Sequence, residues 1–164
     1  NNLIIHRGNN LQAHNLLNGT VQWSLDGFGS NCDFAQSENR LIVLDLSNKK
    51  RHVINALDGS TITTEPLDTS RTYLSNWDEY VLDFKVEANP TSKDEISGIT
   101  KKQVVLRLWN SITGESLLER TVSSDAKANF GDNRYFAVLE PTGKLHYWDL
   151  ATRQETSHDL LASE

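Results

Sequence analysis

Cysteine is nearly absent from this 164-residue chain, and methionine is absent altogether. The single cysteine, Cys32, excludes an internal disulfide framework and any zinc site built from several cysteines. A cysteine nucleophile needs a histidine partner and an electropositive setting, and the surrounding segment NCDFAQ offers neither. We therefore interpret Cys32 as a half-buried strand residue. Because the chain begins at Asn1 and contains no methionine, we expect it to be an excised or processed piece of a longer protein.

Long hydrophobic runs and clusters of positive charge are also missing. No apolar run approaches the roughly 18–20 residues that a membrane span requires, and no Lys/Arg cluster is longer than Lys49-Lys50-Arg51. The formal net charge is −6, whereas phosphate backbones favour clustered positive charge. The composition predicts a soluble globular domain without membrane insertion and without a nucleic-acid partner. The compartment stays open between cytoplasm and export, because a removed signal peptide leaves no trace in the mature chain.

What the chain does contain is a repeat. Four apolar stretches, each with a polar lead-in, begin near residues 3, 41, 80 and 135, so their spacings are 38, 39 and 55 residues. The longest interval holds an additional polar segment, ANPTSKDEISGITKK (88–102), and removing it restores a period near 40. We expect a single propeller-like segment over 1–164 with repeats at about 1–25, 31–65, 71–122 and 126–160. The first of these lacks its leading strand.

Each complete repeat is expected to form four short antiparallel strands. The second stretch is almost continuously apolar, as in a strand that is covered on both faces, and turns such as Asn18-Gly19 and Asp58-Gly59 separate the later stretches. Four-stranded repeats of about 40 residues are typical of propeller blades. A β-sandwich of short hairpins is the alternative, but it would not require the same order of segments four times. The sequence predicts an all-β fold of β-propeller blades of four antiparallel strands, either an incomplete arc of a larger ring of about seven blades or a small ring.

Two known repeat families resemble parts of this sequence. LRLWNSITGESLLERTV (106–122) and LHYWDLATRQETSHDL (145–160) look like the third strand, turn and fourth strand of WD-repeat propellers. HNLLNGTVQWSLDG (14–27) is closer to the PQQ-type repeat of quinoproteins, in which a glycine turn precedes a strand bearing tryptophan. The resemblance covers nearly the whole chain and implies about four degenerate propeller blades.

The chain departs from the WD pattern in several ways. Aligning the turns between the third and fourth strands places Asn15, Asn55, Trp109 and Trp148 at one position, so tryptophan occupies two of four repeats. No Gly-His dipeptide is present, and the turns between the second and third strands, RGNN, SNKK and EPTGK, contain no aspartate. The hydrogen-bonded network of the WD family is therefore expected to be absent. A calcium-holding set of acids, which quinoprotein chemistry would need, cannot be located.

Motifs for catalysis or metal binding are weak. Asp26-Gly27-Phe28-Gly29-Ser30 contains a Gly-x-Gly, but a phosphate-binding loop needs a third glycine and a following helix. His6 and His14 are potential cross-strand neighbours without a third ligand, and the paired acids of the turns are interpreted as solvated. Asn18-Gly19-Thr20 is a formal N-glycosylation sequon that matters only if the protein is secreted, and its Asn-Gly is better explained as a hairpin turn. We expect no catalytic residue, no metal and no cofactor.

The connections at one end of the sheets are the best candidates for binding. In an up-and-down sheet, the connection between the second and third strands leaves from the same end as the connection to the next repeat. The insertion 88–102 therefore shares an end with the connectors 26–31 and 66–71, and loops that vary on a rigid scaffold often bind partners. The expected partner contacts are Asp26, Phe28, Arg71, Lys93, Asp94 and Glu95. The alternative is that the insertion is an extended hairpin without a partner.

The sequence thus favours a non-catalytic β-propeller scaffold that mediates protein–protein interaction through its rim loops. The alternative is the propeller of a quinoprotein-like enzyme, or a sensor domain attached to a catalytic domain outside this segment. Open blade edges also predict a tendency toward self-association.

Overall fold

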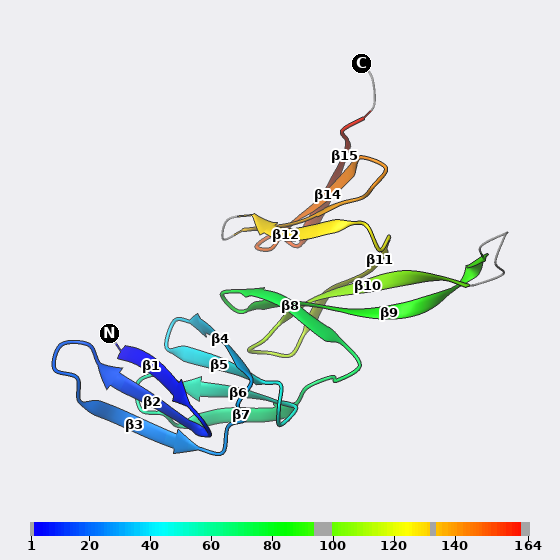
Figure 1. The fold of residues 1–164 in the computed structure, drawn as a ribbon. Coiled ribbons are helices and arrows are strands. Elements are labelled where there is room, and N and C mark those ends of the chain that lie inside the picture. Colours follow the sequence, from blue (N-terminus) through cyan, green and yellow to red (C-terminus); the bar gives the residue numbers. More distant parts are fainter. Residues whose placement is uncertain (1, 94–99, 132–133, 162–164) are drawn as a thin grey trace. The chain divides into compact units, whose positions relative to one another are not determined.

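The computed structural model describes residues 2–93, 100–131 and 134–161, and for 89–93 and 100–102 it describes the backbone alone. These residues form β-strands and turns, with no helix among them (Figure 1). In the described part of the chain there is accordingly no helix that could cross a membrane.

The strands form four antiparallel sheets in chain order. Sheet 1 consists of β1 (Asn2–Arg7), β2 (Asn10–Asn15) and β3 (Val21–Asp26). Sheet 2 consists of β4 (Cys32–Ser37), β5 (Arg40–Asp45), β6 (Lys50–Asn55) and β7 (Thr61–Pro66). Sheet 3 consists of β8 (Thr72–Trp77), β9 (Tyr80–Lys93), β10 (Thr100–Asn110) and β11 (Ser116–Val122). Sheet 4 consists of β12 (Lys127–Gly131), β13 (Tyr135–Leu139), β14 (Lys144–Asp149) and β15 (Gln154–Asp159). Consecutive strands are neighbours in every sheet, so the predicted up-and-down, all-β arrangement is confirmed.

The chain divides into two compact units, each with its own core. The first unit comprises Asn1–Ser70 and Ser111–Gly114, and the second comprises Arg71–Asn110 and Glu115–Glu164. In the first unit, side chains of sheets 1 and 2 pack together, among them Leu11, Trp23, Leu41, Val43 and Ile54. In the second unit, side chains of sheets 3 and 4 do the same, among them Leu82, Leu106, Leu108, Phe136 and Trp148.

The unbroken apolar run of β5 is explained by burial on both faces. Successive side chains of a strand point to opposite faces, yet Leu41, Ile42, Val43 and Leu44 are all at most 2% exposed. Leu41 and Val43 contribute to the core against sheet 1, whereas Ile42 and Leu44 lie on the other face. A strand in this position has no face toward solvent, so its side chains do not alternate between apolar and polar residues.

The turn between the third and fourth strands has the same conformation in all four sheets. It begins with an Asn or Asp that ends the third strand, at Asn15, Asn55, Asn110 and Asp149. Four residues later the backbone is left-handed, at Gly19 (φ 70°), Gly59 (φ 75°), Gly114 (φ 77°) and Arg153 (φ 59°). The residue that starts the turn is an asparagine or aspartate because its side chain closes it. Asn15 Oδ1, for example, accepts a hydrogen bond from Leu17 N at 2.8 Å.

This turn corrects the sequence alignment of the repeats. The structure equates Asn15 and Asn55 with Asn110 and Asp149, so their alignment with Trp109 and Trp148 is wrong by one residue. In sheets 1, 2 and 3 the register slips just before the turn, between Ala13 and His14 in the first case. The feature that all four turns share is the turn-closing Asn or Asp, and not the tryptophan that precedes it in two of them.

Residues Ser111–Gly114, which form the β10–β11 turn, are held in the first unit by Arg51. The Arg51 side chain is 3% exposed, and its Nη1 donates to Ser111 O at 2.8 Å. Its Nη2 pairs with Glu65. A Cβ on Gly114 would lie 3.3 Å from the guanidinium nitrogens, so the backbone passes close to the buried charge.

Candidate interaction surface

The β9–β10 hairpin extends beyond the rest of its sheet. β9 has 14 residues and β10 has 11, whereas no other strand exceeds seven. β8 reaches along β9 only as far as the Thr72–Phe84 pair, and β11 reaches along β10 only as far as the Val122–Val104 pair. Beyond these pairs, among the residues that the structure describes, the two long strands are paired with each other alone, out to Lys93 and Thr100 (Figure 1).

The insertion 88–102 accounts for most of this projection. Its backbone continues the ladder through the Ala88–Lys102 and Lys93–Thr100 pairs, with an irregularity between Thr100 and Lys102. Lys93 therefore lies at the far end of the described part of β9, while Asp94 and Glu95 lie outside the described residues. At the base of the projection, Lys85 Nζ pairs with Glu87 Oε1 at 2.7 Å, and Val86 is 53% exposed.

The two predicted contact residues of the first unit have different environments. Asp26 is exposed at the end of β3, where Asn10 Nδ2 donates to its Oδ1 at 2.9 Å. Phe28 is only 7% exposed and belongs to the core of the unit, where its ring makes a T-shaped contact with His52 at 5.1 Å between centroids. The connector folds back because Gly27 N and Phe28 N both donate to Asn9 O. Phe28 thus anchors the connector and Asp26 is the residue that faces solvent.

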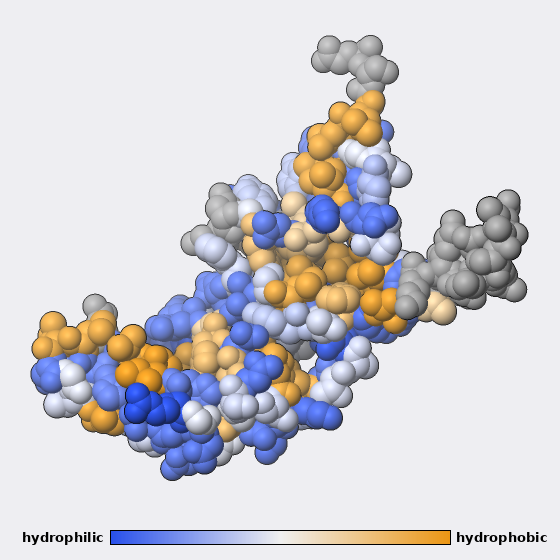
Figure 2. Space-filling view, viewed as in Figure 1, coloured by the Kyte–Doolittle hydropathy of each residue, from blue (hydrophilic) through white to orange (hydrophobic). Residues whose placement is uncertain are grey.

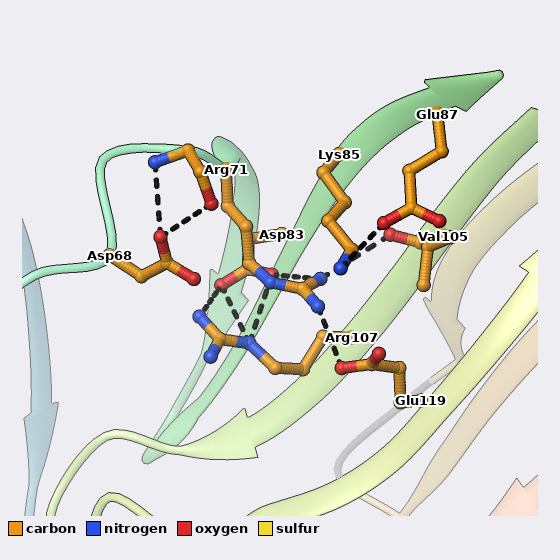
Figure 3. A network of polar contacts seen from close by, with 9 residues as sticks. Asp68, Arg71, Asp83, Lys85, Glu87, Val105, Arg107 and Glu119 are labelled. Atoms are coloured by element: carbon orange, nitrogen blue, oxygen red, sulfur yellow. Dashed lines mark hydrogen bonds and ion pairs between the residues drawn. The ribbon is translucent and has the colours of Figure 1, made fainter.

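Arg71, predicted as a rim contact, is buried in an ionic network of sheet 3 (Figure 3). Its side chain is 5% exposed; Nη1 donates to Asp83 Oδ1 at 3.3 Å and Nη2 to Glu119 Oε2 at 2.6 Å. Arg107 approaches the same Asp83 carboxylate with Nε at 3.1 Å and with Nη2. The strand register pairs Asp83 with Arg107 and Arg107 with Glu119, so the three side chains share one face of the sheet.

The network carries two guanidinium groups and two carboxylates, so its formal charges cancel. Asp83 is 5% exposed, and a carboxylate at that depth is stable only with paired, hydrogen-bonded partners. The arrangement joins β9, β10 and β11 to Arg71, the residue that precedes β8. Sequence analysis missed it, although one signal was available: Asp83 interrupts the otherwise apolar VLDF segment.

Asp45 is a second buried acid that sequence analysis missed. It is fully buried at the end of β5, and its Oδ2 accepts hydrogen bonds from Gly29 N and Asn48 Nδ2, both at 2.8 Å. Its Oδ1 accepts one from Asn48 N at 2.8 Å. Burial acts to raise the pKa of Asp45, but the backbone and side-chain donors outweigh it and lower the pKa overall. The turn SNKK has no aspartate of its own, because the residue that closes it is the last residue of the preceding strand.

The chemistry around Cys32 agrees with a structural role. Burial and the carboxylates of Asp45 and Asp33 raise the pKa of the Cys32 thiol to about 11. The thiol donates to Gly29 O at 3.3 Å. A cysteine with so high a pKa is a protonated, weakly nucleophilic group at neutral pH.

The histidines do not assemble into a site. His6 pairs with Leu11 and His14 with Leu3, so the two rings lie on opposite faces of sheet 1 and are not cross-strand neighbours. His6 contacts Phe34 at 5.6 Å, whereas His14 Nε2 lies 3.0 Å from Gln12 Oε1. Among the described residues, no group of three or more His, Cys, Asp or Glu side chains is placed to hold a metal ion.

Comparisons with known proteins identify the fold. No family model and no curated protein matches the chain. Among solved structures, the WD40 domain of coronin from Toxoplasma gondii is 11% identical with a TM-score of 0.51, over 92% of this chain and 39% of that one. Hsv2p from Kluyveromyces lactis is 14% identical with a TM-score of 0.49, over 99% of this chain and 47% of that one. BamB from Moraxella catarrhalis is 15% identical with a TM-score of 0.44, over 97% of this chain and 61% of that one.

These likenesses bear on architecture alone. The chain spans 39% to 61% of the length of these three structures. The match to the coronin domain, together with four antiparallel up-and-down sheets in chain order, confirms the propeller expectation. The chain is an all-β protein built of degenerate β-propeller blades.

Proposed function

We propose that this chain is a non-catalytic propeller scaffold that binds a protein partner, with the β9–β10 hairpin as its main contact element. The proposal treats residues 1–164 as one propeller segment. The observation that carries it is the length of the hairpin, whose strands continue beyond β8 and β11 and, in their described part, pair only with each other. A two-stranded ribbon is marginal on its own in water, so one maintained beyond its sheet is typical of a binding element.

The open edges of the ribbon provide the chemistry for binding. Backbone N–H and C=O groups along an unpaired strand edge accept another extended segment, as in recognition by β-strand addition. Sheet 3 supplies a rigid base for the ribbon, because the Arg71–Asp83–Arg107–Glu119 network links β9, β10 and β11 to the residue before β8. Arg71 therefore supports the proposed surface as a positioning residue, and Asp26 is the exposed candidate in the first unit.

Shortening the hairpin tests this function. Residues 88–102 are replaced by Asn-Gly, a two-residue turn suited to join the Glu87–Gln103 pair. Partners captured by the wild-type chain are identified, and each is then tested with purified components by titration calorimetry. We expect binding of the direct partner to weaken at least about tenfold, or about 1.4 kcal/mol, while the circular dichroism spectrum and urea midpoint stay close to wild type.

A matched control modifies the corresponding connection of sheet 2. Lys49→Gly alters the exposed β5–β6 turn at a residue whose φ is already 58°, so the fold tolerates glycine there. This variant should bind like wild type. Undiminished binding of every direct partner to the shortened hairpin would remove the β9–β10 hairpin from the proposal.

A further inference from the structure

The β2–β3 turn presents an asparagine side chain whose amide nitrogen is left uncommitted. Asn18 Oδ1 accepts hydrogen bonds from Thr20 N at 3.0 Å and from Thr20 Oγ1 at 2.8 Å. Asn18, Gly19 and Thr20 are all exposed. Within the described residues, the side-chain nitrogen of Asn18 makes no hydrogen bond. The sequence Asn-Gly-Thr at this point is the one Asn-x-Ser/Thr sequon of the chain with a middle residue other than proline.

The turn itself does not require an amide at this position. In the equivalent turn of sheet 2, Asp58 Oδ1 accepts from Ser60 N at 2.8 Å and from Ser60 Oγ at 2.7 Å. The same two hydrogen bonds are thus made by a carboxylate. Asn18 differs from Asp58 by its amide nitrogen Nδ2, which lies next to the Thr20 hydroxyl and can carry a covalent group. The two hydrogen bonds of the turn do not require this nitrogen.

The surroundings of the two turns also differ. A Cβ at Gly19 would have no atom within 4 Å, whereas a Cβ at Gly59 would lie 2.8 Å from the Trp23 ring. The sheet 1 turn therefore has free space around it, and the sheet 2 turn is packed against the neighbouring sheet. Asn18 itself is exposed beside this open position.

Three leucines are exposed at this end of the first unit. Leu16 is 58% exposed, Leu17 95% and Leu57 63%. The two turns lie together, because Asn2, which pairs with Asn15 before the first turn, donates from Nδ2 to Ala56 O in the second at 3.4 Å. Figure 2 shows apolar residues gathered over the β2–β3 turn, at the left end of the first unit. Exposed aliphatic clusters of this kind are a liability unless something covers them.

We propose that Asn18 is a site of N-linked glycosylation and that its glycan covers the aliphatic end of the first unit formed by Leu16, Leu17 and Leu57. The donor is an oligosaccharide linked to a lipid diphosphate. Asn18 Nδ2 forms a bond to the anomeric carbon of the sugar, the bond from that carbon to the diphosphate oxygen breaks, and the lipid diphosphate leaves. Nδ2 loses one proton to the transferase. The chain must therefore pass through a compartment that holds this donor.

The direct test uses the protein purified from its natural source. The peptide containing Asn18 is analysed by mass spectrometry before and after peptide N-glycosidase treatment in ¹⁸O-labelled water. We expect the peptide to appear mainly after treatment, with its asparagine converted to an aspartate that carries one ¹⁸O atom. Label incorporation is essential because an Asn-Gly pair also deamidates spontaneously, and that product formed beforehand carries ordinary oxygen. Full recovery of the peptide without treatment or label would overturn the proposal.

A variant series in a eukaryotic secretory host separates modification from folding. Asn18→Asp keeps the two turn hydrogen bonds seen at Asp58 and should abolish the glycosidase-sensitive mass shift at an unchanged urea midpoint. Thr20→Ser should retain the shift. In the Asn18→Asp background, Asp58→Asn creates a sequon in the packed turn and should be modified less completely than Asn18. A mass shift that persists in Asn18→Asp would show that Asn18 is not the acceptor.

Covering of the leucines has its own readout. Enzymatic removal of the glycan should increase binding of a hydrophobic dye and self-association in sedimentation velocity, and Leu17→Ser should reverse both changes. Equal dye binding with and without the glycan would refute the proposal that the glycan covers the leucines. Whether Asn18 carries the glycan is decided separately by the mass spectra.

Discussion

At the scale of single residues, Asp45 has no exposed surface and still stays ionised. Each of its oxygens faces N–H donors, two from Asn48 and one from Gly29. This set of contacts joins the β5–β6 turn to the connector between sheets 1 and 2. A buried acceptor that serves several donors is difficult to replace, because its loss leaves those donors without a partner. We therefore expect Asp45 to contribute strongly to the stability of the first unit.

Asp45→Asn should destabilise the chain by about 1–3 kcal/mol, because one oxygen becomes an N–H₂ group that faces existing donors. The measurement is the free energy of unfolding from urea titration. The control is Asp33→Asn on neighbouring β4, which we expect to change stability by less than about 0.5 kcal/mol. Equal stabilities for both variants would contradict the structural role of Asp45.

At the scale of elements, the repeated turn shows how one local conformation serves different surroundings. Gly19 and Gly59 share a left-handed backbone, with φ of 70° and 75°. They differ in what lies over them, because only Gly59 faces the Trp23 ring, whose Nε1 donates to Ala56 O at 3.1 Å. The backbone sets a common requirement for glycine, and packing adds a second requirement in one turn.

Gly19→Ala should cost about 1 kcal/mol of stability, because a side chain is disfavoured in the left-handed region. Gly59→Ala should cost about 1–3 kcal/mol more, because its methyl group also displaces Trp23. Urea denaturation monitored by tryptophan fluorescence distinguishes the two. Identical losses of stability would mean that the Trp23 ring can move away from the added methyl group without a measurable change in the free energy of unfolding.

The ionic row of sheet 3 is the other feature at this scale. Asp83→Ala leaves the guanidinium groups of Arg71 and Arg107 without their shared buried acceptor, and should destabilise the chain by about 3–5 kcal/mol. Glu119 has a side chain that is 48% exposed, and Glu119→Gln should cost no more than about 1 kcal/mol. Thermal and urea unfolding of both variants test the difference. A loss of stability in Glu119→Gln as large as that in Asp83→Ala would contradict the view that Asp83 is the main acceptor of the network.

At the scale of the whole molecule, stability should fall in two steps as the pH decreases. Burial lowers the pKa of His52 below its ordinary value of 6.5, so below that pH the unfolded chain gains a proton that the folded chain resists. Asp45, with a lowered pKa, contributes stability above its ordinary value of 3.8 and loses it as the pH falls through and below that value. Urea midpoints measured from pH 8 to 3 should show both steps. His52→Gln should remove the step near pH 6 and keep the acid step, and an unchanged profile would exclude His52 as its source.

The fold was predictable from the sequence because the repeat is local. Each hairpin turn and each apolar strand can be found within a repeat of about 40 residues, and the all-β propeller architecture is confirmed. The ionic network was not predictable, because Arg71 and Glu119 are 48 positions apart and meet only after four strands have paired. The prediction of Phe28 and Arg71 as contact residues rests on their place in the connectors. Such a place does not reveal whether a side chain turns inward, as both of these do.

The attachment of Ser111–Gly114 to the first unit has a consequence for dissecting the protein. The backbone passes from one unit to the other at residues 70/71, 110/111 and 114/115, so no single cut separates them. A fragment ending at Ser70 would lack Ser111 O, the acceptor for the buried Arg51 Nη1. The two units are therefore interlaced along the chain, and deletion mapping by truncation would damage the part that it was meant to isolate.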